Sequence, residues 1–488
     1  MRLGELFDAG VPEAARDLAV TGITADSRRV APGFVFAALK GVAAHGRDFI
    51  DSAKAKGAVA ILSAGDAGDP GLPHVIASDP RRALAFAASR FYPRRPQTIV
   101  AVTGTNGKSS TVDFLRQIWA RSGKRAASMG TLGALWADQK LDLGHTTADP
   151  VHVHQTLQVL ADDGVTHVAM EASSHGLEQS RVAALTFAAG AFLNLTQDHL
   201  DYHGTMDAYR EAKLKLWPLV AGDGWAVVNA DAKEGPAFEE AARKQGLNVA
   251  LAGWRAGEEH GLKIVEIQPR PNGQTLTLRW QGEETNVELP LIGEFQALNA
   301  VTAAALALAL GERPADVWAG MEILQPVKGR IEEVGATPDG AHVFVDYAHT
   351  PDGLNVLLRA ARPHAPGRVV LVFGCGGDRD KDKRPKMGAE AAKFADVVIV
   401  TDDNPRTEDA AAIRKMILAA VPNAFEIADR GQAIREAVSM LRAGDALLIA
   451  GKGHETGQIV ADKIIPFSDQ ETARDALASL GAKERAHG

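Results

Sequence analysis

The sequence is poor in cysteine, with a single one, Cys375, among 488 residues. One cysteine excludes an intramolecular disulfide and suits a reducing compartment. Long hydrophobic runs are also missing, because the most apolar stretch, Ala303–Leu310, falls well short of the about 18 residues that a membrane helix needs. The first residues, Met1–Phe7, mix charged with apolar side chains, unlike a signal peptide. We therefore expect a cytoplasmic protein that does not insert into a membrane.

An excess of positive charge is absent as well. Lysine and arginine number 53 against 61 aspartate and glutamate residues, which gives a net charge of −8. A nucleic-acid partner is held by clustered cations, so this balance argues against one. The composition, 46% hydrophobic and 23% charged, is that of a globular protein, and the length favours about three domains. We expect a monomer that acts on small molecules.

The most informative stretch is Thr98–Thr111, in which an apolar run leads through a glycine-bracketed loop into a helical pattern. The loop reads Gly104-Thr-Asn-Gly-Lys-Ser109. In a phosphate-binding loop the backbone N–H groups and the lysine contact phosphate oxygens, and the serine ligates Mg²⁺. The general motif has its first glycine at the position of Val102 here. An ordinary strand-to-helix turn is the alternative, and the pattern favours a nucleotide site.

Alternating strand and helix patterns predict an α/β protein of three domains. The first, residues 1–97, ends at the proline-bracketed basic stretch Tyr92–Pro96. The second, residues 98–326, is predicted to be a P-loop domain with a mostly parallel sheet, a small antiparallel addition at 249–292 and an alanine-rich helix in Gly293–Gly311. Its expected strands are 99–102, 165–171, 188–194 and 225–229.

The third predicted domain, residues 327–488, is a doubly wound, Rossmann-like sheet with strands at 342–346, 368–373, 396–401 and 446–450. A polar loop follows each of these strands. Because the carboxyl ends of parallel strands meet at one edge of a sheet, the loops 346–352, 374–386, 402–409 and 451–455 are expected to form a binding site.

Three polar features of the central domain could carry chemistry. Glu171 ends an apolar strand, where a carboxylate beside a P-loop suits Mg²⁺ and a helix-capping acid is the alternative. Asp198–Gly204 is rich in Asp and His, and its residues leave open whether it ligates a metal or is a polar loop. Lys213 alone is typical of a solvated helix face. Lys213 and Lys215 lie about 200° apart around a helix, so we expect only one to face a site.

Taken together, these motifs resemble the ATP-dependent Mur ligase family. The matching segments are Gly104–Ser109, Glu171–Leu177, Asp198–Gly204, Glu211–Lys213, Asp346–Asp352 and Gly451–Glu455. The resemblance extends from Asp26 to Phe467. It implies a ligase that adds the third residue of the peptidoglycan stem peptide. Its substrate would be UDP-N-acetylmuramoyl-L-alanyl-D-glutamate, and ATP would activate the D-glutamyl carboxylate as an acyl phosphate.

The resemblance also implies roles for individual residues. Ser109 and Glu171 would hold one Mg²⁺ and His199 a second, while Lys213 would be carbamylated by CO₂ and so become an oxygen ligand for metal. Lys108, Lys213 and His199 are the expected catalytic residues. The residues expected to contact ATP are Gly104, Thr105, Asn106, Gly107, Lys108, Ser109, Ser110, Asn299, Arg330 and Asp346.

The same resemblance places the other two substrates. The residues expected to hold the UDP-muramyl dipeptide are Ser27, Val42, Ala43, Ala44, Thr146, Thr147, Ser173, Gln179 and Arg181. Those expected to hold the incoming amino acid are Arg379, Asp403, Asn404, Pro405, Arg406, Gly451 and Glu455. An arginine at position 406 favours meso-diaminopimelate over L-lysine, because a guanidinium can pair with the second carboxylate that lysine lacks. A capped turn is the alternative for this loop.

Three other functions compete with this hypothesis. The same ligase could use L-lysine, a related ligase similar to folylpolyglutamate synthase could use another acceptor, or a regulatory module could hydrolyse ATP slowly and ligate nothing. The Asp26-Ser27-Arg28 motif and the loop around Arg406 argue against the second. The presence of both the expected metal ligands and the acceptor loop argues against the third.

Overall fold

The computed structural model describes residues 1–41, 44–257, 260–378 and 380–487, with side chains described up to residue 480. It divides into two compact units. The first comprises Met1–Lys263, Trp280–Gly282 and Asn299–Gly320, and the second comprises Ile264–Arg279, Glu283–Leu298 and Met321–Gly488. The three-domain boundaries expected from the sequence stay a prediction. Among the described residues we find no helix with the length and apolarity needed to cross a bilayer.

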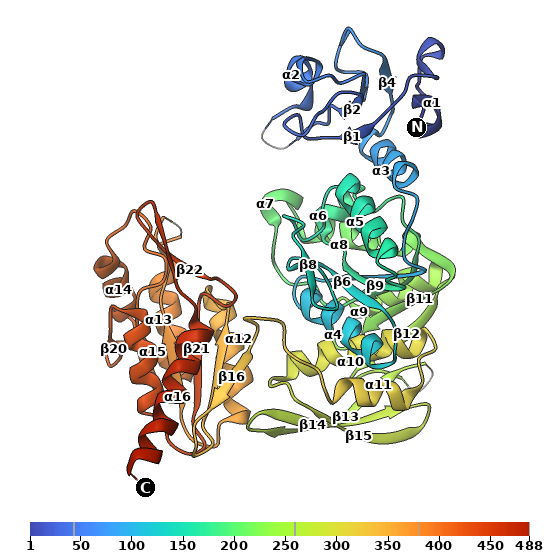
Figure 1. Ribbon diagram of the computed structural model, residues 1–488. Coiled ribbons are helices and arrows are strands. Elements are labelled where there is room, and N and C mark those ends of the chain that lie inside the picture. Colours follow the sequence, from blue (N-terminus) through green and yellow to red (C-terminus); the bar gives the residue numbers. More distant parts are fainter. Residues whose placement is uncertain (42–43, 258–259, 379, 488) are drawn as a thin grey trace. The chain divides into compact units, whose positions relative to one another are not determined.

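The N-terminal part of the first unit is a parallel sheet, drawn in blue in Figure 1. Its strands, in spatial order, are β1 (Gly22–Thr24), β2 (Phe34–Ala37), β3 (Ala60–Ser63) and β4 (His74–Ile76). The helices here are α1 (Leu3–Leu6), α2 (Ile50–Ala55) and α3 (Pro80–Phe91). Helix α3 begins where it does because the Asp79 side chain accepts a hydrogen bond from the Arg82 amide and proline takes the first helical position.

The first unit also holds a sheet in the order β12-β11-β10-β5-β9-β6-β7-β8. The neighbours from β12 to β6 are parallel, and β6 to β8 are antiparallel, so the predicted mostly parallel sheet is confirmed. Its strands are β5 (Thr98–Thr103), β6 (Ala126–Gly130), β7 (Gly133–Trp136), β8 (Gln139–Leu141), β9 (His167–Glu171), β10 (Phe187–Phe192), β11 (Val220–Asn229) and β12 (Asn248–Gly253). The sequence predicted four of these strands, β5, β9, β10 and β11, and missed β6, β7, β8 and β12.

Helices flank this sheet and bury a large apolar core, in which the rings of Phe192 and Phe238 stack at 3.5 Å between centroids. The helices are α4 (Lys108–Arg121), α5 (Pro150–Asp162), α6 (Ser174–Glu178), α7 (Leu200–His203), α8 (Met206–Leu214) and α9 (Gly235–Lys244). The predicted alanine-rich helix is α10 (Glu294–Ala309), followed by α11 (Pro314–Met321).

Three further strands continue the order of the sheet beyond β12: β13 (Leu262–Arg270), β14 (Gly273–Trp280) and β15 (Glu283–Leu289). Two-residue connections join β13 to β14 and β14 to β15, and such short connections require antiparallel neighbours. The antiparallel addition predicted at 249–292 is therefore present from β13 on, whereas β12, at the start of that range, pairs in parallel with β11. The first strand of this addition pairs in parallel with β12 at Leu262 and Lys263.

The second unit contains a sheet in the order β16-β17-β21-β18-β19-β20, in which only the edge pair β16–β17 is antiparallel. The strands are β16 (Glu332–Ala336), β17 (His342–Asp346), β18 (Val369–Phe373), β19 (Val397–Val400), β20 (Phe425–Glu426) and β21 (Ala446–Ala450). All four strands predicted from the sequence are present. A hairpin of β22 (Gly457–Val460) and β23 (Lys463–Pro466) follows.

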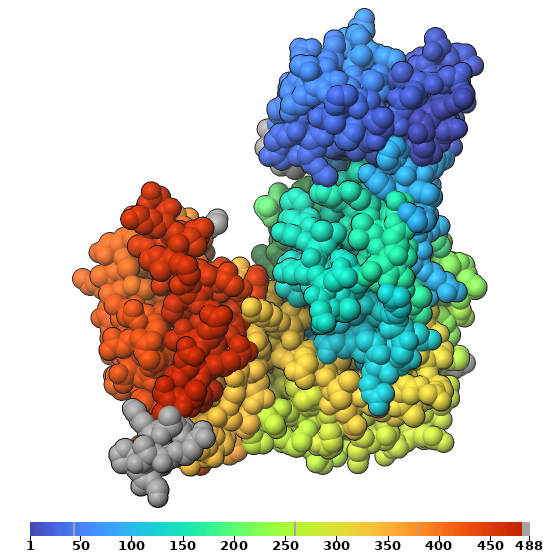
Figure 2. Space-filling view, viewed as in Figure 1, coloured from blue at the N-terminus to red at the C-terminus, as the bar shows by residue number. Residues whose placement is uncertain are grey.

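Helices cover both faces of this sheet, as a doubly wound fold requires (Figure 1). One face packs against α12 (Pro351–Ala361), α13 (Lys383–Phe394) and α14 (Ala410–Leu418), and the other against α15 (Arg430–Ser439) and α16 (Asp469–His487). Alternate side chains of the inner strands β17, β21, β18 and β19 enter the two cores, for example Leu371 and Val370 of β18. In Figure 2 the sheet and its helices form one continuous body in orange and red.

Candidate functional site

The glycine-bracketed loop connects β5 to α4, as the sequence predicts. Gly107 precedes the helix with φ of +87°, and a Cβ there would lie 2.3 Å from Asn299 Oδ1. Only glycine satisfies both the left-handed backbone and this close approach. Asn299, expected to contact ATP, therefore lies directly against the loop. Ser110 is buried in the first turn of α4.

The segment after β10 holds the loop in place. Thr105 N donates to the Asn194 carbonyl at 2.9 Å, and Asn106 N donates to Asn194 Oδ1 at 2.9 Å. Thr196 N donates to Thr105 Oγ1, whose hydroxyl also lies 3.2 Å from the Tyr209 hydroxyl. These hydrogen bonds hold the glycine-bracketed loop in one conformation.

Two lysines converge on one carbonyl of this loop. Lys108 Nζ and Lys213 Nζ each donate to Gly104 O at 2.9 Å. Lys213 is 1% exposed, and burial, reinforced by the charge of Lys108, lowers the pKa of its ammonium to about 6. Lys215 is instead exposed and pairs with Glu178 at 2.6 Å. The prediction that only one of the two helical lysines faces a site is confirmed.

Glu171, at the end of β9, is 2% exposed. Its carboxylate accepts hydrogen bonds from Ser109 Oγ at 2.8 Å and Thr131 N at 2.8 Å. Within the described ranges, no lysine, arginine or histidine forms an ion pair with it. A buried carboxylate without a cationic partner is costly, and Mg²⁺ prefers oxygen ligands of this kind. The pair Ser109–Glu171 therefore fits a magnesium ion.

In the part of the chain that the structure describes, no three His, Cys, Asp or Glu side chains gather closely enough to hold a metal ion. Any ion beside Glu171 would thus depend on hydroxyl, phosphate or carbamate oxygens to complete its coordination. These oxygens are hard ligands that suit Mg²⁺.

His199, the other expected metal ligand, precedes α7 in a left-handed conformation with φ of +53°. Its amide donates to Asp198 Oδ1 at 2.8 Å, and its ring lies 6.2 Å from that of Tyr209 between centroids. The His175 ring is also near, at 4.8 Å. Burial, with His199 and His203 nearby, lowers the pKa of His175. The sequence reasoning gave His175 no role, although it lies within the Glu171–Leu177 motif.

The residues expected to hold the muramyl dipeptide lie together beside Glu171. Thr147 Oγ1 donates to the Glu171 carbonyl at 2.9 Å and accepts from Ser173 N at 3.0 Å. Arg181 donates to the Thr147 carbonyl and, through Nη2, to Gln179 Oε1 at 2.8 Å. Thr146 also belongs to this group, since its hydroxyl lies 3.0 Å from that of Thr131.

The expected uridine loop follows β1. Arg28 makes a forked ion pair with Asp26, and this pairing lowers the pKa of the Asp26 carboxyl to about 2. The Ser27 carbonyl accepts from Lys56 Nζ at 2.9 Å. Val42 and Ala43 lie outside the described residues; the Ala44 carbonyl accepts from Gly41 N at 3.0 Å.

A pocket of about 260 Å³ opens at the carboxyl ends of β2 to β4. Its lining includes Lys40, Asp66 and Arg81, the last near the start of α3. Because β1 runs parallel to β2, the Asp26–Arg28 loop emerges at the same edge of this sheet as the pocket.

In the second unit, Asp346 ends β17 and accepts from Ile331 N at 2.8 Å and Ala348 N at 2.7 Å. Burial raises the pKa of this carboxyl. The Arg330 guanidinium lies over the Tyr347 ring, 5.1 Å from its centroid. The structure thus brings together Arg330 and Asp346, the two residues of this unit that the family resemblance assigns to ATP.

The loop after β19 carries Arg406, whose φ is +51°. Its amide donates to the Ile459 carbonyl at 3.1 Å, and its Nη1 donates to the Gly377 carbonyl at 2.8 Å. Pro405 is buried against Gly377, where a Cβ would lie 1.9 Å from the Pro405 carbonyl oxygen. Arg379 lies outside the described residues.

Other residues expected to bind the amino acid converge at the same edge. Asn404 Nδ2 donates to Glu455 Oε2 at 2.9 Å. Gly451 has φ of +119°, and a Cβ there would lie 2.8 Å from Asp403 Oδ2. The loops after β19 and β21 therefore meet, as the topology predicts.

Among the described residues this region holds buried cations that were not predicted, Lys452 and Arg384 among them. Lys452 is 0% and Arg384 1% exposed, and Arg384 forms a forked ion pair with Glu408 at 2.9 and 3.1 Å. Glu408 also accepts from Asp378 N, so this pair ties the loop after β18 to the loop of Arg406. The sequence contained two signals that could have led to them: a lysine within the motif Gly451–Glu455 and an arginine at the start of α13.

We expect the Arg384–Glu408 pair to make stability depend on pH. The forked pair, joined by the hydrogen bond from Asp378 N, lowers the pKa of Glu408 from 4.5 to about 2. Its contribution is therefore complete above pH 4.5 and is lost as the pH falls toward 2. Urea unfolding of wild type and Glu408→Gln at pH 3 and pH 6 measures the free energy of unfolding of each protein. The difference in this free energy between the two proteins should be smaller at pH 3 than at pH 6. An equal difference at both values would contradict this role.

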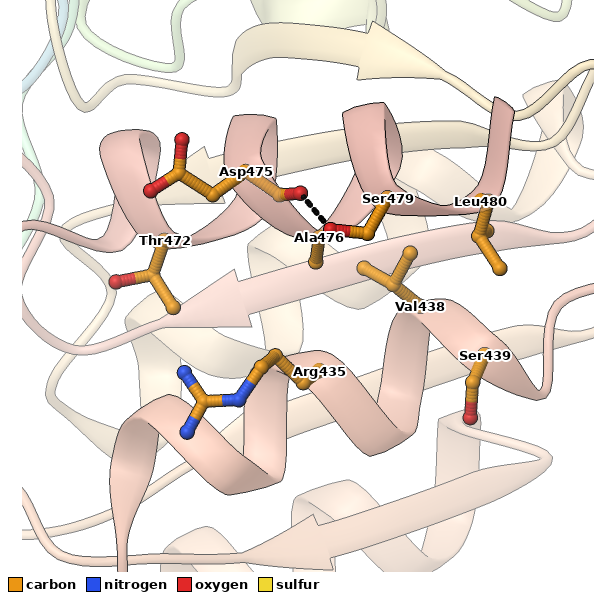
Figure 3. Close-up of a pocket in the computed structure, with 8 residues that line it drawn as sticks. All are labelled: Arg435, Val438, Ser439, Thr472, Asp475, Ala476, Ser479 and Leu480. Atoms are coloured by element: carbon orange, nitrogen blue, oxygen red, sulfur yellow. Dashed lines mark hydrogen bonds between the residues drawn. The ribbon is translucent and has the colours of Figure 1, made fainter. Parts of the chain in front are cut away.

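A further pocket, of about 240 Å³, lies between α15 and α16 (Figure 3). Arg435, Val438 and Ser439 face it from α15, and Ser479 on α16 donates to the Asp475 carbonyl. None of its lining residues belongs to the motifs described above, so we assign it no role in the candidate site.

Three family models match the chain: the Mur ligase family catalytic domain at residues 19–92, the Mur ligase middle domain at 102–307 and the Mur ligase glutamate ligase domain at 329–453. A UDP-N-acetylmuramoyl-L-alanyl-D-glutamate–2,6-diaminopimelate ligase of Caulobacter vibrioides is 49% identical over 99% of both chains. The ligase of the same name from Bradyrhizobium diazoefficiens is 49% identical over 98% of this chain and 99% of its own. A solved structure of that name matches with a TM-score of 0.78 and 30% identity over 99% of both chains.

Proposed function

Because the chain belongs to the Mur ligase family, as its motifs predicted, we propose that it joins meso-2,6-diaminopimelate to UDP-N-acetylmuramoyl-L-alanyl-D-glutamate at the expense of ATP. The product is a precursor of peptidoglycan, so the enzyme serves cell wall synthesis, and we place it in the cytoplasm as a monomer. One observation carries the proposal: a fixed phosphate-binding loop with the buried acid Glu171 beside it occurs in a chain similar to diaminopimelate ligases along its whole length.

ATP would bind with its phosphates on the loop Gly104–Ser109, and Lys108 would leave the loop carbonyls for phosphate oxygens. Ser109 and Glu171 would hold Mg²⁺, which supplies charge neutralisation between the phosphates. The lack of a cationic partner for Glu171 among the described residues supports this assignment. Asn299, Arg330 and Asp346 stay predicted contacts of the nucleotide.

Lys213 is proposed to carry a carbamate. Its amine is buried beside Lys108 and has no carboxylate partner among the described residues. Such a position disfavours the ammonium and favours the neutral amine, the only form that adds CO₂. The resulting anion would pair with Lys108 and offer oxygen to a second Mg²⁺, for which His199 is the other proposed ligand.

The UDP-muramyl dipeptide is proposed to bind the first unit. The pocket at the carboxyl ends of β2 to β4 and the Ser27 loop would hold the nucleotide part. Thr146, Thr147, Ser173, Gln179 and Arg181 would hold the dipeptide, and their hydrogen-bonded grouping beside Glu171 supports this. Arg181 offers a guanidinium to a carboxylate.

Diaminopimelate is proposed to bind the edge formed by Arg406, Asn404 and Glu455. Arg406 uses Nη1 on the Gly377 carbonyl and keeps Nη2 and Nε for the far carboxylate of the substrate. L-Lysine has no group for this position, so the guanidinium would stay without its anion. The site therefore discriminates against L-lysine.

In the reaction, the γ-phosphoryl group moves from ATP to the D-glutamyl carboxylate, which gives ADP and an acyl phosphate. The neutral amine of diaminopimelate attacks the acyl carbon, the C–O bond to phosphate breaks, and the amine proton is released. Lys108 stabilises the charge on the transferring phosphoryl group, and the fixed loop keeps the donor and acceptor aligned. The chain mainly positions its substrates and neutralises charge.

The test is phosphate release with purified protein, ATP, Mg²⁺ and the UDP-muramyl dipeptide, with diaminopimelate, L-lysine or no amine added. We expect release that requires both the dipeptide and diaminopimelate. Release with L-lysine at equal efficiency would overturn the choice of amine but keep the ligase. Slow phosphate release that depends on neither the dipeptide nor the amine would instead support a regulatory ATPase.

A further inference from the structure

We infer that Lys452 is a positioning residue for the amino-acid substrate, because its buried ammonium orients both Asn404 and Glu455. This inference rests on the proposed function. Lys452 follows β21 and is 0% exposed, so it does not itself face solvent. The sequence motif singled out its neighbours Gly451 and Glu455 and gave the lysine no role.

The ammonium of Lys452 makes two hydrogen bonds and a further ion pair. Nζ donates to Asn404 Oδ1 at 2.9 Å and to Glu455 Oε2 at 3.0 Å, and it lies 3.7 Å from Asp403 Oδ1. Lysine offers donors and no acceptor, so Asn404 Oδ1 and Glu455 Oε2 accept from it, and the Asp403 carboxylate adds an opposite charge nearby. Asp403, Asn404, Lys452 and Glu455 are called the Lys452 cluster below.

This arrangement fixes the Asn404 amide. Its Oδ1 accepts from both Lys452 Nζ and Ile459 N, each at 2.9 Å. The Nδ2 group must then point to Glu455 Oε2. A flipped amide would place its NH₂ against an ammonium and a backbone N–H, which are both donors, so only one orientation is compatible with Lys452.

Glu455 is oriented in turn. Its Oε2 accepts hydrogen bonds from both Lys452 Nζ and Asn404 Nδ2, whereas no donor among the described residues contacts Oε1. Burial raises the pKa of Glu455, but the hydrogen bonds from Asn404 and Lys452 outweigh it, and the pKa is lowered. The carboxylate is therefore ionised, with one oxygen left for a ligand.

The charges of the cluster match one ammonium group. Lys452 offsets one of the two carboxylates of Asp403 and Glu455, which leaves one negative charge. The nearby Arg430–Asp469 pair, with contacts of 2.7 and 2.8 Å, is neutral as a unit. Diaminopimelate attacks through one neutral amine and keeps its other amine as an ammonium, so this single charge fits the group that does not react.

Strand β22 connects the cluster to Arg406. Ile459 N donates to Asn404 Oδ1, and the Ile459 carbonyl accepts from Arg406 N. Ile459 thus contacts both the Lys452 cluster, proposed to bind the far ammonium, and Arg406, proposed to bind the far carboxylate. Both charges sit on the same carbon of diaminopimelate, which requires such a fixed relation.

The experiment compares steady-state kinetics of wild type, Lys452→Met and a matched control, Arg368→Met. Arg368 pairs with the buried Asp445 near the amino ends of the strands, so its loss also leaves a buried carboxylate unpaired, but away from the loops. For Lys452→Met we expect the KM for diaminopimelate to rise about 10-fold or more, with kcat within about threefold and the KM for ATP unchanged. Arg368→Met should lower the melting temperature and leave all KM values unchanged.

Asn404→Asp provides a second test if Lys452→Met does not fold. It keeps the shape but replaces the Nδ2 donor with an oxygen facing Glu455 Oε2, so the KM for diaminopimelate should rise here as well. An unchanged KM for diaminopimelate in a folded variant would overturn the role of Lys452. Absence of diaminopimelate-dependent phosphate release by the wild type would instead count against the proposed function.

Discussion

Replacing Lys213 with methionine is expected to lower kcat by about 1,000-fold or more, because the proposed carbamate would be lost together with its charge and its oxygens for metal. Methionine fills the buried site without an amine, so the fold should persist. Lys215→Met is the matched control, since Lys215 lies two residues away, is exposed and pairs with Glu178. We expect its kcat to stay within about twofold of wild type. The rate of phosphate release at saturating substrates measures kcat for both variants.

A second readout separates the carbamate from a simple loss of charge. With ¹³C-labelled bicarbonate, wild type and Lys215→Met should show one carbamate carbon signal in NMR spectra, and Lys213→Met should show none. Full activity of Lys213→Met, or a signal that persists in it, would contradict the assignment. Loss of activity without any carbamate signal in the wild type would show that Lys213 acts as an amine.

Replacing Arg406 with alanine should remove the preference for diaminopimelate. Truncating one partner of a buried, charged pair costs about 2 to 5 kcal/mol, so kcat/KM for diaminopimelate should fall by about 30-fold to several thousand-fold. The value for L-lysine should change little, because lysine has no carboxylate for Arg406 to bind.

Arg435→Ala is the control for this variant, since Arg435 is an arginine of α15 that lies outside the loops (Figure 3). Its kinetics should match those of wild type. The ratio of kcat/KM for the two amines measures the effect independently of enzyme concentration. A ratio that stays at the wild-type value in Arg406→Ala would assign the discrimination to another residue.

The sequence alone determined the local parts of this protein. The apolar run before Gly104 predicted β5. The glycine positions predicted the loop, because the backbone conformation at Gly107 depends only on that residue and its neighbours in sequence. The strands 342–346 and 446–450 were predicted with the observed bounds, since buried parallel strands are continuous apolar runs. Short strands such as β4 and β8 carry no such run, and they were missed.

Only the tertiary structure decided which of these parts meet. Sheet order places β10 beside β5, and the segment after β10 then holds the glycine-bracketed loop. The convergence of Lys108 and Lys213 on one carbonyl joins residues 105 positions apart, and no local pattern encodes it. The same holds for Lys452, which the sequence placed in a polar loop without a role and which the structure buries against Asn404 and Glu455. Burial and charge pairing depend on the whole fold, and they decide which of the predicted residues can act.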